Sequence, residues 1–153
     1  MNTSEIKTKS NIGYRILAGI VDYSFIFSFS FIYIITYGNI DTEDNYSLNG
    51  IKSIIPVLIW GIMTIGIELL FGATVGNFLV GLKPLSIRKD SDNFGKKLNF
   101  TQSLKRHLLD SIDMMFFGLI GIITIKNTEK NQRLGDIWAN TIVIKETELK
   151  NEK

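Results

Sequence analysis

The chain has 153 residues, no cysteine, one histidine and a net charge of +2. This length suits one domain, and the small charge argues against a nucleic-acid partner. Without cysteine there is no disulfide, thiolate catalysis or cysteine-ligated metal, and a single histidine excludes a histidine-rich metal site. No catalytic constellation stands out, so we expect neither an enzyme nor a bound cofactor or metal.

The first apolar run extends from Ile16 to Tyr37 and contains one charge, Asp22. A helix of this length covers roughly 33 Å, which is enough to cross the hydrocarbon core of a bilayer. The run is longer than the apolar part of a signal peptide, and no small-residue cleavage site follows it. It therefore predicts a transmembrane helix over about 15–37.

Two further apolar runs follow, from Ile54 to Phe71 and from Leu108 to Ile125. The first contains Glu68 as its one charge, and the second carries two aspartates near its start. A chain this short has too little polar sequence to cover three such runs in water. They predict an integral membrane protein with further spans at about 53–71 and 107–126.

The charges of the loops predict the orientation. The loop from Gly38 to Gly50 carries only acidic charges, whereas the stretch from Gly72 to His107 has seven lysines and arginines. Basic residues also precede the first run. The positive-inside rule therefore predicts a multi-pass protein of the inner membrane with its N-terminus and second loop in the cytoplasm.

The third run conflicts with this rule if it crosses the membrane, because six basic residues follow it. Gly118 and Gly121 interrupt the run, so it is predicted either to dip in and return or to lie along the inner surface. We favour a cytoplasmic tail over a crossing third span.

The polar segments predict a small β element. Residues 85–88 and 97–100 flank a turn-like sequence and suggest a hairpin, to which the strand-like residues 141–144 would add. That addition needs the second loop and the tail on the same side. Thr101 is the expected N-cap of the following helix.

The predicted fold is thus all-α: an integral membrane protein with two clear transmembrane helices, a third broken or re-entrant apolar helix and a small cytoplasmic β element. We expect a cytoplasmic N-terminal tail over 1–12, a membrane domain over 13–145 and a flexible charged tail over 146–153.

Charged residues within apolar runs need a partner or a function, since each costs roughly 2.5–3.5 kcal/mol at the centre of a membrane helix. The predicted helices bring five charged residues toward the cytoplasmic side: Arg15, Asp22, Glu68, Asp110 and Asp113. These residues form either an ion, proton or small-ligand site or a satisfied network in which Arg15 neutralises Asp22 or Glu68. Both alternatives stay open for Asp22, and the network is favoured for Glu68, Asp110 and Asp113. His107 is expected at the membrane interface.

Three motifs occur in order: Arg-x-x-Ala-x-x-x-Asp from Arg15 to Asp22, Gly-x-Thr-x-Gly from Gly72 to Gly76, and Arg-x-x-Asp-x-x-Ala-x-Thr-x-Val from Arg133 to Val143. Together they resemble the RDD family, membrane proteins of bacteria and archaea named for one arginine and two aspartates. The resemblance implies that these three are Arg15, Asp22 and Asp136. It also implies transport of unidentified ligands, some members being linked to sodium/proton exchange.

On this resemblance, Asp136 at a cytoplasmic boundary is predicted to pair with Arg15 and to hold the tail against the bundle, which leaves Asp22 for a ligand. The candidate binding residues are therefore Asp22, Arg15, Asp136 and Glu68.

The expected function is transport of ions or small solutes, such as cation/proton exchange, by an oligomer, because three short segments do not enclose a path alone. The alternative is a non-transporting accessory protein of a larger membrane complex. The expected partners are the bilayer, a second copy or another membrane protein, and a small ion or solute.

Overall fold

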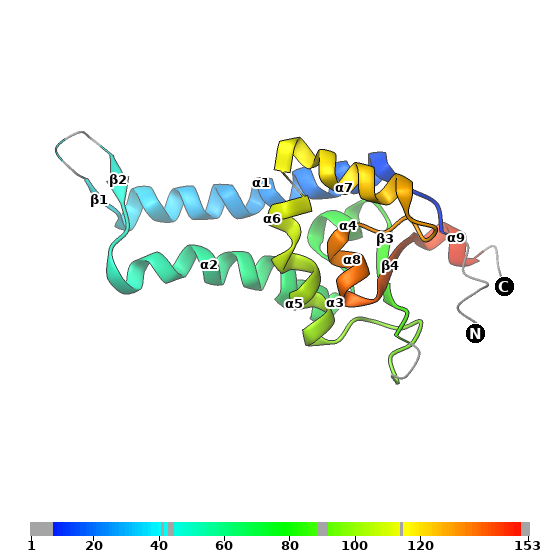
Figure 1. Ribbon diagram of the computed structural model, residues 1–153. Coiled ribbons are helices and arrows are strands. Elements are labelled where there is room, and N and C mark those ends of the chain that lie inside the picture. The colour runs from blue at the N-terminus through cyan, green and yellow to red at the C-terminus, as the bar shows by residue number, and fades with distance from the viewer. Residues whose placement is uncertain (1–7, 41, 43–44, 89–91, 114, 151–153) are drawn as a thin grey trace.

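The computed structural model describes residues 8–40, 42, 45–88, 92–113 and 115–150, and this part of the chain is mostly helical (Figure 1). Helix α1 spans Ile12–Tyr37. The second long helix is continuous over Gly50–Phe71 and consists of η1 (Gly50–Ser53), α2 (Ile54–Gly61), a π-helical stretch η2 (Ile62–Gly66) and α3 (Ile67–Phe71). Both helices are long and apolar enough to cross a membrane, which confirms the first two predicted segments.

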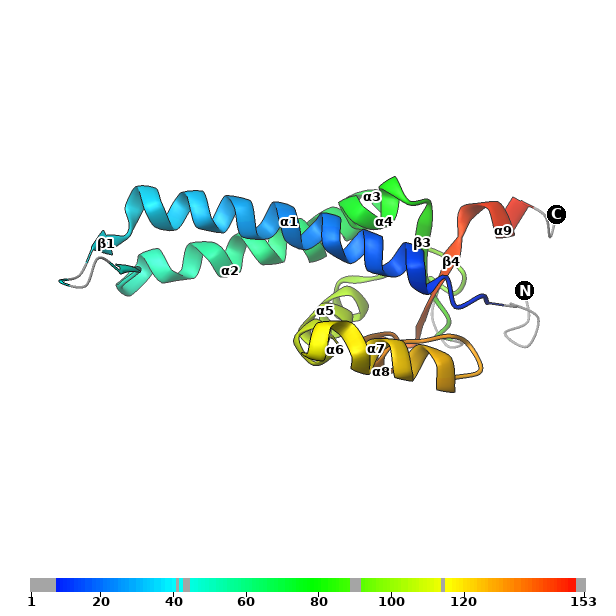
Figure 2. The same ribbon diagram turned by 90° about the horizontal axis from the view of Figure 1, so that it is seen from above.

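The two long helices project from a body as a hairpin (Figures 1 and 2). At its tip, β1 (Asn39–Ile40) pairs antiparallel with β2 (Tyr46–Ser47). Large apolar side chains stay exposed along the hairpin, for example Phe27 at 66% and Phe31 at 64%. Lipid is the environment in which such faces are stable.

The third apolar run does not form one straight helix. Helix α5 (Phe100–Leu108) ends where the run begins, and α6 (Asp110–Asp113) and α7 (Met115–Asn127) follow. The chain bends by 114° between Phe100–Asp113 and Gly118–Asn127. Gly118 has φ +84°, a conformation that glycine adopts at little cost. The prediction of a broken or re-entrant third helix is confirmed.

The body contains a two-stranded antiparallel sheet of β3 (Leu82–Ser86) and β4 (Thr141–Lys145), in which Leu82 pairs with Lys145 and Ser86 with Thr141. Leu85, Ile142 and Ile144 form its apolar core. The strand predicted over 141–144 is confirmed, and it joins the second loop to the tail.

The hairpin predicted between 85–88 and 97–100 is wrong. Only isolated backbone bonds join Ser86 to the turn, whereas five residues of β4 make a continuous ladder and bury an apolar face. Asn99 then starts α5 in place of Thr101. Its side chain accepts a bond from the Gln102 amide, and the Gln102 side chain accepts one from the Asn99 amide, which makes a complete capping box.

Three short helices complete the body: α4 (Val75–Leu79), α8 (Leu134–Ala139) and α9 (Glu146–Lys150). Helix α9 occupies the start of the segment predicted as a flexible tail. The remainder of that tail, 151–153, and residues 1–7 of the predicted N-terminal tail lie outside the described residues.

Candidate functional site

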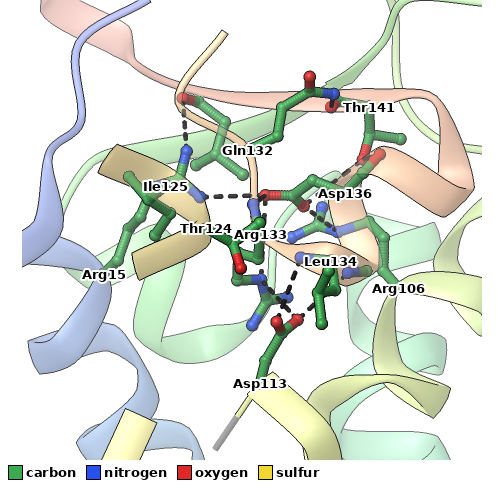
Figure 3. Close-up of polar contacts among 12 residues, drawn as sticks. Arg15, Arg106, Asp113, Thr124, Ile125, Gln132, Arg133, Leu134, Asp136 and Thr141 are labelled. Atoms are coloured by element: carbon green, nitrogen blue, oxygen red, sulfur yellow. Dashed lines mark hydrogen bonds and ion pairs between the residues drawn. The ribbon is translucent and has the colours of Figure 1, made fainter. Parts of the chain in front are cut away.

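The predicted contact between Arg15 and Asp136 is confirmed. Arg15 lies in the first turn of α1, and its Nη1 is 3.0 Å from Oδ2 of Asp136 on α8. Its Nη2 donates to the carbonyls of Asn131 and Val143, at 3.0 and 3.2 Å. Figure 3 shows the two side chains pointing toward one another across the body. This contact ties the start of the first long helix to α8 and β4.

Arg106 extends the network from α8 to the second long helix. Its Nε lies 3.1 Å from Oδ1 of Asp136, and its Nη1 lies 3.1 Å from Oε1 of Glu68. The arginine is only 1% exposed. Helix α8 approaches α5 this closely because Gly135 has no side chain: a Cβ there would lie 2.5 Å from the Arg106 carbonyl oxygen. The alternative in which Arg15 neutralises Glu68 is therefore wrong, since Arg106 is the arginine that reaches it.

His107 lies between two carboxylates. Its Nδ1 is 2.7 Å from Oδ2 of Asp110, and its Nε2 is 3.4 Å from Oε2 of Glu68. Glu68 also accepts a hydrogen bond of 2.6 Å from the Ser103 hydroxyl, and Asp110 is 2.9 Å from Arg133. The sequence suggested only an interfacial place for His107, yet the side chain is buried among partners from α3 and α6.

Asp113 holds the start of α8. Its two oxygens accept hydrogen bonds from the amides of Leu134 and Gly135, at 3.1 and 3.2 Å. These amides lie at the start of the helix and lack hydrogen-bond partners within it. A carboxylate at this position accepts their hydrogen bonds and interacts favourably with the positive end of the helix dipole. Figure 3 shows Asp113 below Leu134 and Arg133. The role of Asp113 is therefore that of a helix cap.

Asp22 contacts the glycine-rich motif and not Arg15. Its Oδ2 accepts a bond of 2.7 Å from the Thr74 hydroxyl, and its Oδ1 accepts one of 2.7 Å from the Gly76 amide. Thr74 in turn caps α4, and Gly76 lies so close to α1 that a Cβ would overlap the Ala18 carbonyl. The first and second motifs thus form one packing unit. The alternative in which Arg15 neutralises Asp22 is wrong.

We call the eight ionisable residues that meet in the body the charge cluster: Arg15, Glu68, Arg106, His107, Asp110, Asp113, Arg133 and Asp136. Three arginines face four carboxylates, so the charge cluster carries one excess negative charge while His107 is neutral. A proton on His107 makes it electrically balanced.

The arrangement of opposite charges shifts the pKa values of Asp136 on α8 and of Arg133, which precedes α8. Burial raises the pKa of Asp136, but Arg106, Arg133 and Arg15 outweigh burial and hold that pKa at about 2. Burial lowers the pKa of Arg133, but Asp110, Asp136 and Asp113 together raise it above its ordinary value. Both side chains are therefore charged at neutral pH. Among the described residues, no group of three or more acidic, histidine or cysteine side chains is arranged to hold a metal ion.

Two membrane-length helices, a third apolar segment that is broken, and an ion-paired base fit a multi-pass membrane protein. The RDD family model matches residues 9–140, which include Arg15, Asp22 and Asp136. The chain belongs to the RDD family. No curated protein and no solved structure matches it.

Proposed function

We propose that this protein transports ions or small solutes across the cell membrane as an oligomer, by cation/proton exchange, with its N-terminus in the cytoplasm. The observation that carries the proposal is the position of His107 between Glu68 and Asp110, in a buried cluster with one carboxylate in excess. Burial lowers the pKa of His107, but Asp110 and Glu68 outweigh burial and raise it to about 9, so a proton on His107 balances the excess carboxylate at neutral pH. A small cation balances the same charge once that proton has left.

Exchange follows from competition for that charge. With His107 neutral, the charge cluster attracts a monovalent cation, and with His107 protonated, the attraction is lost. Two positive charges at close range in a buried site repel strongly, so a proton on His107 and a bound cation exclude one another. Because two membrane-length helices and one broken segment do not enclose a path alone, more than one copy is needed.

The test is cation-driven proton movement in everted membrane vesicles, with sodium, potassium and lithium. The wild type and Asp92→Asn, an exposed control, are expected to show flux, and His107→Gln at matched expression is expected to lose it. Loss in Asp22→Asn as well would extend the path to that carboxylate. No flux above that of empty vesicles would overturn the proposal.

A second candidate is a non-transporting accessory protein of a larger membrane complex. It is favoured by the hydrogen bonds of Asp22, since both oxygens are occupied by donors of the chain itself. This alternative predicts a stable membrane partner that co-purifies with the wild type, together with the absence of flux.

A further inference from the structure

We propose that the side of the body formed by α5, α6 and α8 lies against the phospholipids of the leaflet that surrounds the inner ends of the two long helices. We call this side the leaflet surface, and its members are Lys105, Leu108, Ile112, Ile137 and Trp138. The inference concerns the seating of the body in the membrane and does not depend on transport.

The orientation of α5 is the first observation. Figures 1 and 2 show α5 lying across the direction of α1, on the side of the body from which the hairpin projects. One side of α5 carries Ser103, Arg106 and His107 into the charge cluster, and these are buried. The other side carries two open apolar side chains, Phe100 at 59% and Leu108 at 49% exposed. A helix with two such sides, lying across the spans, has the form of an interfacial helix.

The lengths of the two long helices indicate how deep α5 lies in the bilayer. Asp22 is 15 residues from the outer end of α1 at Tyr37, and Glu68 is 18 residues from Gly50. At ~1.5 Å per residue these segments cover roughly 22 and 27 Å, less than the ~30 Å of a hydrocarbon core. The bilayer therefore extends past both carboxylates toward the body. Because Ser103 and Arg106 bond to Glu68, α5 lies at the level where the hydrocarbon ends.

The chemistry of the exposed side chains fits that level. Trp138 is 47% exposed, and the ammonium of Lys105 lies 5.4 Å from its ring centroid. Tryptophan is enriched where headgroups meet hydrocarbon, and lysine there extends its charge to lipid phosphates. Ile112 on α6 and Ile137 on α8 are also open, at 40% and 42% exposed, and apolar side chains at this level are stabilised by lipid.

The ion pairs and the sheet agree with this placement. The Arg15–Asp136 contact and the β3–β4 ladder hold three segments together: the start of α1, the chain after the second long helix, and the tail. When α1 and the second helix both cross, these three segments lie on one side of the membrane. The third apolar run then begins and ends on that side, so it does not cross the membrane, and α5 is the part of the body that lies across the spans (Figures 1 and 2).

The experiment uses Trp138 as a depth probe, because the chain has only two tryptophans. The full-length Trp60→Phe variant is reconstituted in phosphatidylcholine and phosphatidylglycerol vesicles. The lipids are brominated either near the headgroup or near the end of the acyl chain. The Trp138→Phe variant leaves Trp60, ten residues from Gly50 in the second helix, as the deep control. We expect at least twofold stronger quenching of Trp138 by the shallow bromines than by the deep ones, and the reverse for Trp60.

Three results would overturn the proposal while Trp60 is quenched as expected. Trp138 that responds only to acrylamide faces water. Trp138 quenched most by deep bromines lies in a crossing segment. Trp138 protected from both acrylamide and brominated lipid is covered by protein.

Discussion

The two ends of the long helices are built in different ways; we call the end next to β1 and β2 the outer end and the end within the body the inner end. From Tyr23 to Tyr37 and from Ile54 to Ile67 the sequence has no charged residue, and its large side chains face outward. At the inner ends, Arg15, Asp22 and Glu68 each bond to segments far away in the sequence. Lipid is sufficient for the outer end. The inner end depends on buried ion pairs, which are costly to leave incomplete.

The largest expected effect comes from removing the acid shared by three arginines. Asp136→Ala leaves Arg15 and Arg106 buried beside no carboxylate on α8, and breaking such a buried pair costs about 3–5 kcal/mol. We expect a sharp fall in the yield of monodisperse protein and in its Tm in detergent. Asp92→Ala, at an exposed position, is the control and is expected to match the wild type. Wild-type yield and Tm for Asp136→Ala would show that the inner end does not depend on this carboxylate.

The next effect comes from the crossing of α1 and α4. In Gly76→Ala the new methyl group meets the backbone of Ala18, which has no rotamer to change, so we expect a loss of about 1–3 kcal/mol. Gly13→Ala is the matched control because a Cβ there meets nothing within 4 Å. Thermal unfolding in detergent compares the two, and similar Tm values would contradict the close approach.

A smaller effect is expected for Asp22→Asn. The amide keeps the size of the side chain and one acceptor, but it loses the stronger bonds that a charged carboxylate makes with Thr74 and Gly76. We expect a loss of about 1 kcal/mol, measured by Tm, with Thr74→Ser close to the wild type because it keeps the hydroxyl. If Asp22→Asn lost as much stability as Asp136→Ala, the two aspartates would not have separate roles.

The smallest effect is expected on the hairpin. Phe27 is 66% exposed in the part of α1 without charges, and Phe27→Leu keeps an apolar surface toward lipid. We expect a change within about 0.5 kcal/mol in the same Tm assay. A loss comparable to that of Gly76→Ala would mean that Phe27 contacts protein, and it would remove the contrast between the two ends.

Much of the fold can be predicted from the sequence because a helix that crosses a membrane needs an apolar run of a minimum length. The first two spans, the break at Gly118 and the strand of residues 141–144 are readable from apolar runs, a glycine and β-branched residues. The Arg15–Asp136 contact was predicted only with the help of the family motifs. The false hairpin arose because residues 97–100 resemble a strand locally, whereas the partner of β3 lies more than fifty residues away.

The centre of the charge cluster was not predictable in the same way. Arg106 and Arg133 count as ordinary cytoplasmic charges in the positive-inside rule, and nothing local shows that Arg106 is buried or that Arg133 pairs with Asp110. His107 is likewise adjacent to apolar residues on one side and basic ones on the other. One signal was available: Gly135 precedes Asp136, and its missing side chain is what lets α8 approach Arg106.

The central claim is that an ion pair joins the start of the first span to the tail. A double-mutant cycle with Arg15→Gln and Asp136→Asn tests it most directly, through the free energy of unfolding in detergent. The account predicts coupling: the double variant loses at least about 1 kcal/mol less than the sum of the single losses. Losses that add to within about 0.5 kcal/mol would show that the two residues act independently and would contradict the claim.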